Sequence, residues 1–300
     1  MKRILTIQDI SCVGRCSLTV ALPIISAMGV ETAVLPTAVL STHTAFTHFT
    51  FRDLTEDIPG IEKAWEQEGI RFDAIYSGYL GSARQTELVA ECWERFGAAS
   101  GAENRTGAMN GKAERSDAAR ALRFVDPAMA DNGRLYAGFD EAFVDAMRRL
   151  TSRADVIVPN LTEACLLSGI SYRESFTDAE YRDLMKRLAD HGPESVILTG
   201  YANSGTDIGA LAYRRDTDEF FSVTGERIPV AYHGTGDIFA SVMVGALAIG
   251  LDLETAARLA VDYDRLCIQK TAEDENRRWY GVNFEEALPW LVQQMNGDVK

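Results

Sequence analysis

The sequence predicts an α/β fold in which helices cover both faces of a mostly parallel sheet. Two observations lead to this prediction. Short apolar runs alternate with longer amphipathic segments along the chain. Each run is also brief, rich in Ile, Val or Leu, and closed by a polar or turn-forming residue. Parallel strands have this composition because helices bury both of their faces.

Six strands are expected in this sheet, with helices between them. The strands are Arg3–Gln8, Thr32–Pro36, Ala74–Ser77, Arg123–Val125, Val156–Pro159 and Val196–Thr199. The helical stretches include Gly60–Glu68, Gln85–Phe96, Glu141–Leu150, Asp178–Ala189 and Ile238–Leu247. Two further runs, Ile208–Arg214 and Glu219–Val223, flank the polar turn Arg215–Asp218 and predict an antiparallel hairpin.

The length of 300 residues allows one large α/β domain or two small ones. The alternating pattern by itself does not decide between these two. One segment departs from that pattern. Gly97–Ala119 is small, polar and without an apolar period, which indicates a flexible surface insertion between a helix and the strand at Arg123.

The charge balance excludes several classes of partner. Thirty Lys and Arg against 44 Asp and Glu give a formal net charge of −14, so nucleic acid and anionic membranes are repelled. The five cysteines are scattered and odd in number, as in a protein with reduced thiols. With neither a signal peptide nor an apolar stretch of membrane-spanning length, we expect a cytoplasmic protein.

The most informative stretch is a glycine loop that precedes the apolar helix at Ile238. Gly234, Thr235 and Gly236 expose consecutive N–H groups where a helix begins, and such a loop binds anions. Asp237 completes the loop and has two possible roles. It could cap the helix, which these residues alone favour, or it could act as a general base beside a phosphoryl group.

Polar residues also follow three buried strands, at the sheet edge where open α/β folds bind ligands. Asp126 follows one strand, and Asn160 and Glu163 follow the next. Thr199 and Gly200 end a third. Carboxylates near phosphate oxygens are the environment that Mg²⁺ requires, and phosphoryl transfer needs an anion cradle, a metal and a base.

These residues resemble the ribokinase superfamily and, within it, the pyridoxal (vitamin B6) kinases. The resemblance runs from Ile4 to about Ile268, excluding the insertion. Its marks are Ile7–Asp9, Ser41–Thr44, Ser77–Ser82, Asp126–Met129, Pro159–Glu163 and Gly234–Asp237. The last of these marks the superfamily, whereas Ser41–Thr44 and Ser77–Ser82 point to the pyridoxal kinase branch. The resemblance implies a single domain over residues 1–300 with a three-layer α/β/α ribokinase-like fold and, as is usual in the family, a homodimer.

The resemblance also implies an activity, the transfer of the γ-phosphate of ATP to the 5′-hydroxymethyl group of pyridoxal, pyridoxine or pyridoxamine. Asp237 would accept the hydroxyl proton, and the N–H groups of Gly234, Thr235 and Gly236 would stabilise the transferring phosphoryl. The residues implied for Mg²⁺ are Asp126 and Glu163, with Asp131 near a possible monovalent cation. Those implied for the nucleotide are Asn160, Thr199 and Gly200, with Tyr136 on a flap above it.

On the acceptor side, Asp9 and Thr44 would hydrogen-bond the pyridine ring and Tyr79 would contact it. Many pyridoxal kinases carry a small hydroxyl residue where this chain has Asp9. A carboxylate there favours a cationic partner, so we expect pyridoxamine or pyridoxine to be preferred over pyridoxal. The segment Pro229–His233 lacks the cysteine pair with which some related kinases trap the aldehyde.

Other interpretations remain open. A hydroxymethylpyrimidine kinase of thiamine synthesis acts on the same hydroxymethyl handle, and a vitamer-binding relative without catalysis could keep the same pocket. Tyr79 and Tyr136 could equally be packing residues. His43 is more typical of a hydrogen-bonded structural histidine than of a catalyst.

Overall fold

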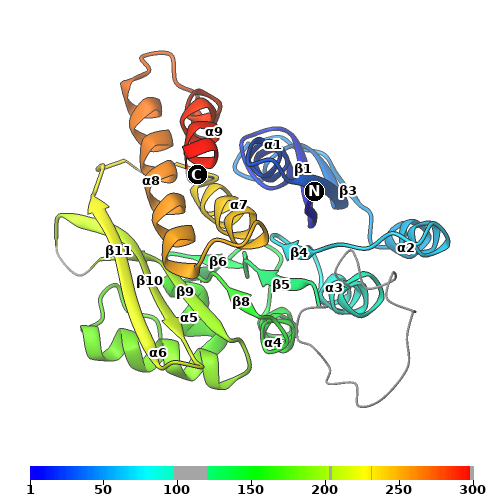
Figure 1. The fold of residues 1–300 in the computed structure, drawn as a ribbon, viewed down its shortest axis with the longest axis horizontal. Helices are drawn as coiled ribbons and strands as arrows, with labels where there is room; N and C mark the ends of the chain where they lie inside the picture. Colours follow the sequence, from blue (N-terminus) through cyan, green and yellow to red (C-terminus); the bar gives the residue numbers. More distant parts are fainter. Residues whose placement is uncertain (98–119, 203–204, 231, 298–300) are drawn as a thin grey trace.

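A mostly parallel sheet forms the centre of the molecule (Figure 1). The computed structural model describes residues 1–97, 120–202, 205–230 and 232–297, and within these the sheet has nine strands in the order β11-β10-β9-β8-β5-β4-β1-β2-β3. The strands are β1 (Arg3–Val13), β2 (Glu31–Thr42), β3 (Phe51–Asp53), β4 (Ala74–Ser77), β5 (Leu122–Val125), β8 (Val156–Ile157), β9 (Ser195–Tyr201), β10 (Asp207–Arg214) and β11 (Glu219–Glu226). Within this described sheet, β10 and β3 run in the direction opposite to the other seven strands.

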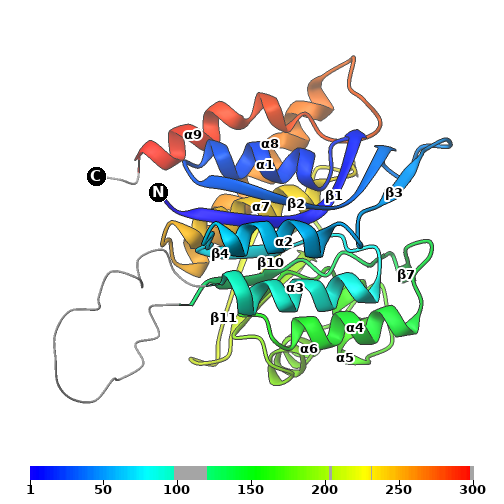
Figure 2. The same ribbon diagram turned by 90° about the vertical axis from the view of Figure 1, so that its right-hand side faces the viewer.

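Helices cover both faces of the sheet, so the fold has three layers (Figure 2). The first group is α1 (Leu18–Ala27), α7 (Thr235–Ala248), α8 (Leu253–Glu273) and α9 (Leu288–Gly297). The second group is α2 (Ile58–Gln67), α3 (Ala83–Phe96), α4 (Glu141–Thr151), α5 (Leu161–Ser168) and α6 (Asp178–Asp190). A short hairpin, β6 (Ala130–Asp131) and β7 (Arg134–Leu135), and a 3₁₀ turn, η3 (Phe284–Glu286), complete the described elements.

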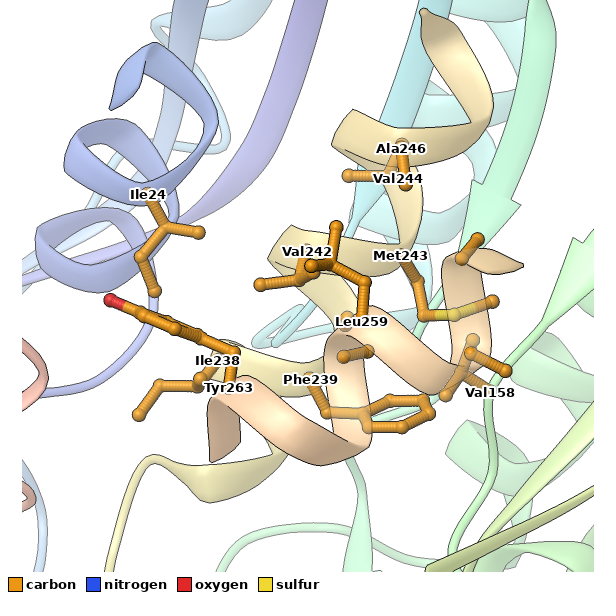
Figure 3. Close-up of a cluster of buried hydrophobic side chains, with 14 of the residues drawn as sticks. Ile24, Val158, Ile238, Phe239, Val242, Met243, Val244, Ala246, Leu259 and Tyr263 are labelled. Carbon is orange, nitrogen blue, oxygen red and sulfur yellow. The ribbon is translucent and has the colours of Figure 1, made fainter. Parts of the chain in front are cut away.

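The first helical layer packs around α7, which is apolar on all sides. Ile238, Phe239 and Met243 of α7 are buried against Ile24 of α1 and Tyr263 of α8 (Figure 3). A helix that is hydrophobic all round must be enclosed by other elements. The start of α7, which carries the glycine loop, is therefore held in place by the core.

The predicted fold class is confirmed, and the hairpin is present as β10 and β11. The main differences lie at strand ends. β1 continues to Val13 and β2 to Thr42, whereas the sequence predicts ends at Gln8 and Pro36. In these continuations polar residues pair with apolar ones, as Ser11 does with Leu40 and Thr42 with Val13, so no continuous apolar run marks the strand ends. β8 stops at Ile157.

Residues 98–119, almost the whole of the predicted insertion Gly97–Ala119, lie outside the described residues. Its interpretation as a flexible insertion stays a prediction. All five cysteines are free thiols, and Cys12 is exposed. Among the residues that the structure describes, no helix is both long and apolar enough to cross a membrane.

Candidate functional site

The predicted site residues come together because parallel strands end at one edge of the sheet. The N–H of Asp126, directly after β5, donates to the carbonyl of Ser77 at the end of β4 (2.9 Å). The N–H of Thr199 in β9 donates to the carbonyl of Pro159 after β8 (3.0 Å). The start of α7 faces this same edge, since the charge of Asp237 acts on the carboxyl group of Asp126.

The glycine loop depends on a backbone conformation that only glycine adopts without strain. Gly234 is the residue before α7 and has a φ of 87°. A Cβ at this position would lie 2.0 Å from the carbonyl oxygen of Arg15, in the loop between β1 and α1. The loop is therefore packed directly on the β1–α1 loop, and the N–H groups of the first turn of α7 have no acceptor within the helix, as in anion sites at helix N-termini.

Asp237 does not cap α7, so the capping interpretation that the loop residues alone favour is wrong. The helix begins at Thr235 without a side-chain cap, and Asp237 lies within its first turn. Its carboxyl group instead accepts a hydrogen bond from the backbone N–H of Ser17. Burial raises the pKa of Asp237 to about 7, and the charge of Asp9 adds to the rise. A carboxyl group with this pKa can take up a proton near neutral pH.

Glu163 and Asp126 form a buried carboxyl pair beside Asp237. Glu163 closes a capping box at α5, where its two oxygens accept N–H groups of Met129 (3.1 Å) and Asn160 (2.9 Å). Burial raises the pKa of Glu163. Burial, and then the charges of Glu163 and Asp237, raise the pKa of Asp126 well above its usual range. Because the charges of Glu163 and Asp237 both disfavour the ionised form of Asp126, a cation bound at Asp126 would stabilise that form.

The donor set suits Mg²⁺, which binds one or two carboxylates and completes its shell with water and phosphate oxygens. Across the described ranges, no three His, Cys, Asp or Glu side chains are grouped closely enough to hold a metal by themselves. Asp126 and Glu163 therefore fit a magnesium ion that is shared with a phosphate ligand. They do not fit a closed structural metal site.

Asp131 lies in the β6–β7 hairpin, and Tyr136 is the residue that follows this hairpin. Both carboxylate oxygens of Asp131 interact with Asn132, through its N–H (2.8 Å) and its side-chain amide (2.9 Å). Tyr136 is 40% exposed, but burial of its hydroxyl and then the charge of Glu163 raise its pKa. The hydroxyl thus lies toward the carboxyl pair, which suits a residue at the entrance of the site.

The residues predicted for the nucleotide lie at the ends of β8 and β9. Asn160 caps α5: its side-chain oxygen accepts the N–H of Glu163 (3.0 Å) and its amide donates to the carbonyl of Ala130 (2.8 Å). Thr199 is half-buried, and Gly200 is exposed with a φ of 70°. Asn160 therefore has a structural role, and contacts from these three residues to a nucleotide stay a prediction.

On the predicted acceptor side, the structure brings Asp9 close to both Tyr79 and Asp237. Asp9 is buried and accepts a hydrogen bond from the hydroxyl of Ser11 (3.1 Å). Burial raises its pKa, and its charge raises the pKa values of both Asp237 and Tyr79. The ring of Tyr79 is half-buried, 5.6 Å from that of Phe139. Thr44 is exposed in the turn after β2.

His43 is a structural residue, as the sequence indicates. Its Nε2 lies 3.0 Å from the carbonyl oxygen of Tyr280, and its Nδ1 accepts the N–H of Ala45 (3.2 Å). Its ring is 5.3 Å from that of His233, next to the glycine loop. His43 therefore joins the loop after β2 to the loop after α8.

Two residues of the site have no recognisable signal in the sequence. Ser17 holds Asp237 through its N–H and has a φ of 50°, which is strained for a residue other than glycine. Arg15 supplies the carbonyl against Gly234, and its guanidinium contacts the side chains of Asn283 and Glu285. These contacts join segments far apart in the sequence, so no local motif marks them.

Comparison with known proteins identifies the family. A family model described as phosphomethylpyrimidine kinase matches residues 107–279, more than half of the chain. The chain belongs to the phosphomethylpyrimidine and pyridoxal kinase family. That family lies within the ribokinase superfamily, and its members are kinases of vitamin B6 or hydroxymethylpyrimidine.

Solved structures of the family match over the whole chain. A provisionally assigned phosphomethylpyrimidine kinase from Bacteroides thetaiotaomicron is 38% identical, covers 97% of this chain and 93% of its own, and has a TM-score of 0.87. A second crystal form, with pyridoxal, is 37% identical, covers 97% of this chain and 95% of its own, and has a TM-score of 0.85. Pyridoxal kinase from Lactobacillus plantarum is 28% identical over 99% of both chains, with a TM-score of 0.85.

Alignments to curated relatives are shorter. The match to pyridoxal kinase from Arabidopsis thaliana is 23% identical over 73% of this chain and spans 65% of that protein.

Proposed function

We propose that this protein transfers the γ-phosphate of ATP to the 5′-hydroxymethyl group of a vitamin B6 vitamer. The observation that carries the proposal is the position of Asp237. It lies in the first turn of α7, is not used as a cap, and is flanked by the anion-binding glycine loop and the Asp126–Glu163 pair. A base, an anion cradle and a metal site at one sheet edge meet the requirements of phosphoryl transfer.

In the proposed mechanism, Asp237 accepts the proton of the acceptor hydroxyl. The hydroxymethyl oxygen forms a bond to the γ-phosphorus as the bond to the bridging β–γ oxygen breaks, and ADP leaves with that oxygen. The N–H groups of Gly234, Thr235 and Gly236 stabilise the charge on the transferring phosphoryl. Asp126 and Glu163 would hold Mg²⁺, which neutralises phosphate charge when bound.

The acceptor site lies toward β1 and β4, where Asp9 and Tyr79 surround the approach to Asp237. Tyr79 offers an apolar ring face to a heteroaromatic substrate, and Asp9 accepts hydrogen bonds from N–H groups. The pyridoxal in one crystal form of the Bacteroides relative supports a pyridine-type acceptor for this chain as well.

Phosphorylation of hydroxymethylpyrimidine is the second candidate, favoured by the phosphomethylpyrimidine kinase model that matches residues 107–279. The two acceptors share a hydroxymethyl group on a nitrogen-containing aromatic ring, so the catalytic residues serve both. Only the ring-contacting residues can discriminate between them.

A coupled assay of ADP release tests the proposal, with Mg²⁺ and ATP in the presence of pyridoxal, pyridoxine, pyridoxamine, hydroxymethylpyrimidine or ribose. We expect the largest kcat/KM with a B6 vitamer and background rates with ribose. The largest value with hydroxymethylpyrimidine would establish the second candidate. Saturable vitamer binding without ADP release from any acceptor would indicate a non-catalytic binding protein and refute both.

A further inference from the structure

Asp264 is a half-buried residue whose carboxyl group the proposed catalytic machinery does not use. It lies in the middle of α8, and its Oδ1 is shielded from solvent without a hydrogen-bond partner among the residues that the structure describes. Buried polar atoms in native proteins almost always have a partner, and a buried carboxylate left alone is costly. The Oδ1 of Asp264 is therefore free to accept a hydrogen bond from a bound molecule.

The contacts of the next residue place Asp264 at the ligand-binding edge of the sheet. The Nε of Arg265 donates to the carbonyl of Glu226, the last residue of β11 (3.4 Å). A Cβ on Gly225 would lie 2.8 Å from the Arg265 guanidinium. This part of α8 therefore lies against the carboxyl end of β11, immediately before the segment that leads to the glycine loop.

The register of the hairpin fixes the level of Asp264 along the strands. Gly225 of β11 pairs with Ile208 of β10, and the adjacent Gly209 pairs with Tyr201 of β9. The carboxyl ends of β11 and β9 thus lie at the same level. Asp264 is therefore level with the strand end that carries Thr199 and Gly200, the residues proposed for the phosphate chain, and β10 lies between that strand and β11.

The helix face that carries Asp264 points inward. Ala260 and Cys267, at positions i−4 and i+3, share this face and are fully buried in the core with α7. Figure 1 shows α8 lying beside both α7 and β11. The Asp264 carboxyl group therefore faces the region between α8, the end of β11 and the start of α7.

The sheet order decides which end of a bound nucleotide reaches this region. Asp9 and Tyr79, on β1 and after β4, occupy one side of the catalytic centre, where the acceptor is proposed. β9, β10 and β11 lie on the opposite side. With the triphosphate at the glycine loop, the base must extend away from the acceptor, toward β11 and α8.

We propose that the carboxyl group of Asp264 contacts the base of the nucleotide and selects adenine by accepting a hydrogen bond from its 6-amino group. This inference rests on the proposed function, because it takes the phosphoryl donor to be ATP. An acceptor oxygen complements the 6-amino group, and this hydrogen bond is lost with a purine that has no amino group at position 6.

The protonation state of Asp264 is compatible with this role. Burial raises its pKa to about 8, so the neutral acid predominates at pH 7. A neutral carboxyl group accepts one hydrogen bond and donates another. Adenine matches this pattern, because its 6-amino group donates a hydrogen bond and the adjacent ring nitrogen accepts one.

Calorimetric titration without any acceptor tests the assignment, using Mg²⁺ complexes of ATP and of purine riboside triphosphate, which lacks only the 6-amino group. We expect the unmodified protein to bind ATP about tenfold or more tightly than the analogue. Asp264→Leu should bring the two affinities within about threefold, through loss of ATP affinity. Asp264→Asn, whose amide also accepts and donates, should keep most of the preference.

Asp262→Asn is the matched control, because Asp262 is exposed on the same helix. It should leave the preference unchanged. Equal affinities of the unmodified protein for ATP and the analogue, or a preference that persists in Asp264→Leu, would overturn the assignment. Should the Leu variant fail to fold, the comparison in the unmodified protein still decides. Selective ATP binding without phosphorylation of any acceptor would refute the proposed function alone, and phosphorylation with no preference for the amino group would refute this assignment alone.

Discussion

The two halves of the site are built in different ways. The phosphoryl-transfer half uses short local motifs: Asp126, Glu163 and Asp237 each follow a strand or begin a helix, and backbone geometry orients them. The acceptor half joins β1, the turn after β2, the loop after β4 and the loop after α8 through contacts between distant residues, such as His43 with Tyr280. Chemistry that is common to a superfamily can thus remain in the first half while substrate choice varies in the second.

The largest expected effect comes from removing the proposed base. Asp237→Asn should lower kcat by about 10²–10⁴-fold, because proton removal from the hydroxyl is lost. The affinity of the variant for ATP, measured by titration, should stay within a few-fold of that of the unmodified protein. Asp262→Asn, an exposed carboxylate on α8, serves as the control and should keep full activity. An Asp237→Asn variant with near-normal kcat would refute the assigned role.

The pKa of Asp237 predicts the pH dependence of the same step. Since burial raises the pKa to about 7, the group is protonated and inactive as a base below that pH. The kcat/KM for the acceptor should therefore rise with pH and level off above about 7. A profile that is flat from pH 5.5 to pH 8.5 would contradict the role of Asp237 as the base.

The glycine loop offers a matched pair of substitutions. Gly234→Ala should destabilise the fold by about 1–3 kcal/mol and weaken ATP binding, since Gly234 has a positive φ and no room for a Cβ beside Arg15. Gly236→Ala should leave the melting temperature nearly unchanged, because nothing lies within 4 Å of the added atom. Thermal melts of both variants check this, and equal losses would show that the contact with Arg15 is not a constraint.

The buried carboxyl pair predicts a pH-dependent stability that Mg²⁺ counteracts. The folded-state pKa of Asp126 is raised, so its contribution to stability is present below its unfolded pKa and is lost as pH rises through the folded value. An Asn at position 126 cannot ionise, so the Asp126→Asn variant avoids this loss of stability. Without Mg²⁺, its melting temperature should therefore exceed that of the unmodified protein by a margin that grows as pH rises. Mg²⁺ with nucleotide should narrow the gap at high pH. A difference in melting temperature between the two proteins that does not change with pH would argue against a raised pKa of Asp126.

The sequence predicted more of the first half of the site than of the second. The polar residues that follow the buried strands, the glycine loop and the Asn160–Glu163 motif are local, so composition and spacing reveal them. Asp237 shows the limit of this reasoning. An Asp after a glycine loop suggests a cap, and only the N–H of Ser17, from a different loop, shows that its carboxyl group is used elsewhere. The strained φ of Ser17 has no sequence signal.

Strand lengths show a second limit. Asp9 lies within β1, at the point where the pairing with β2 shifts register between Gln8 and Ile10. Such irregularities change the direction in which side chains point near active sites, and they depend on pairing between strands. Neither the burial of Asp9 nor its position next to Asp237 could be predicted from residues 3–13 alone.

The smallest expected effect concerns acceptor choice, and it tests the half of the site that depends on distant contacts. Asp9 is a buried acceptor beside the approach to Asp237, so it should favour vitamers that present an N–H or a positive charge. Asp9→Asn should reduce the kcat/KM for pyridoxamine about tenfold relative to that for pyridoxal, since a charge-assisted hydrogen bond becomes a neutral one. Thr44→Ala, in an exposed turn of the same half, is the comparison variant. It should lower kcat/KM by a similar factor for all three vitamers. Equal kcat/KM for the three vitamers in the unmodified protein, unchanged in Asp9→Asn, would show that this carboxylate does not discriminate among them.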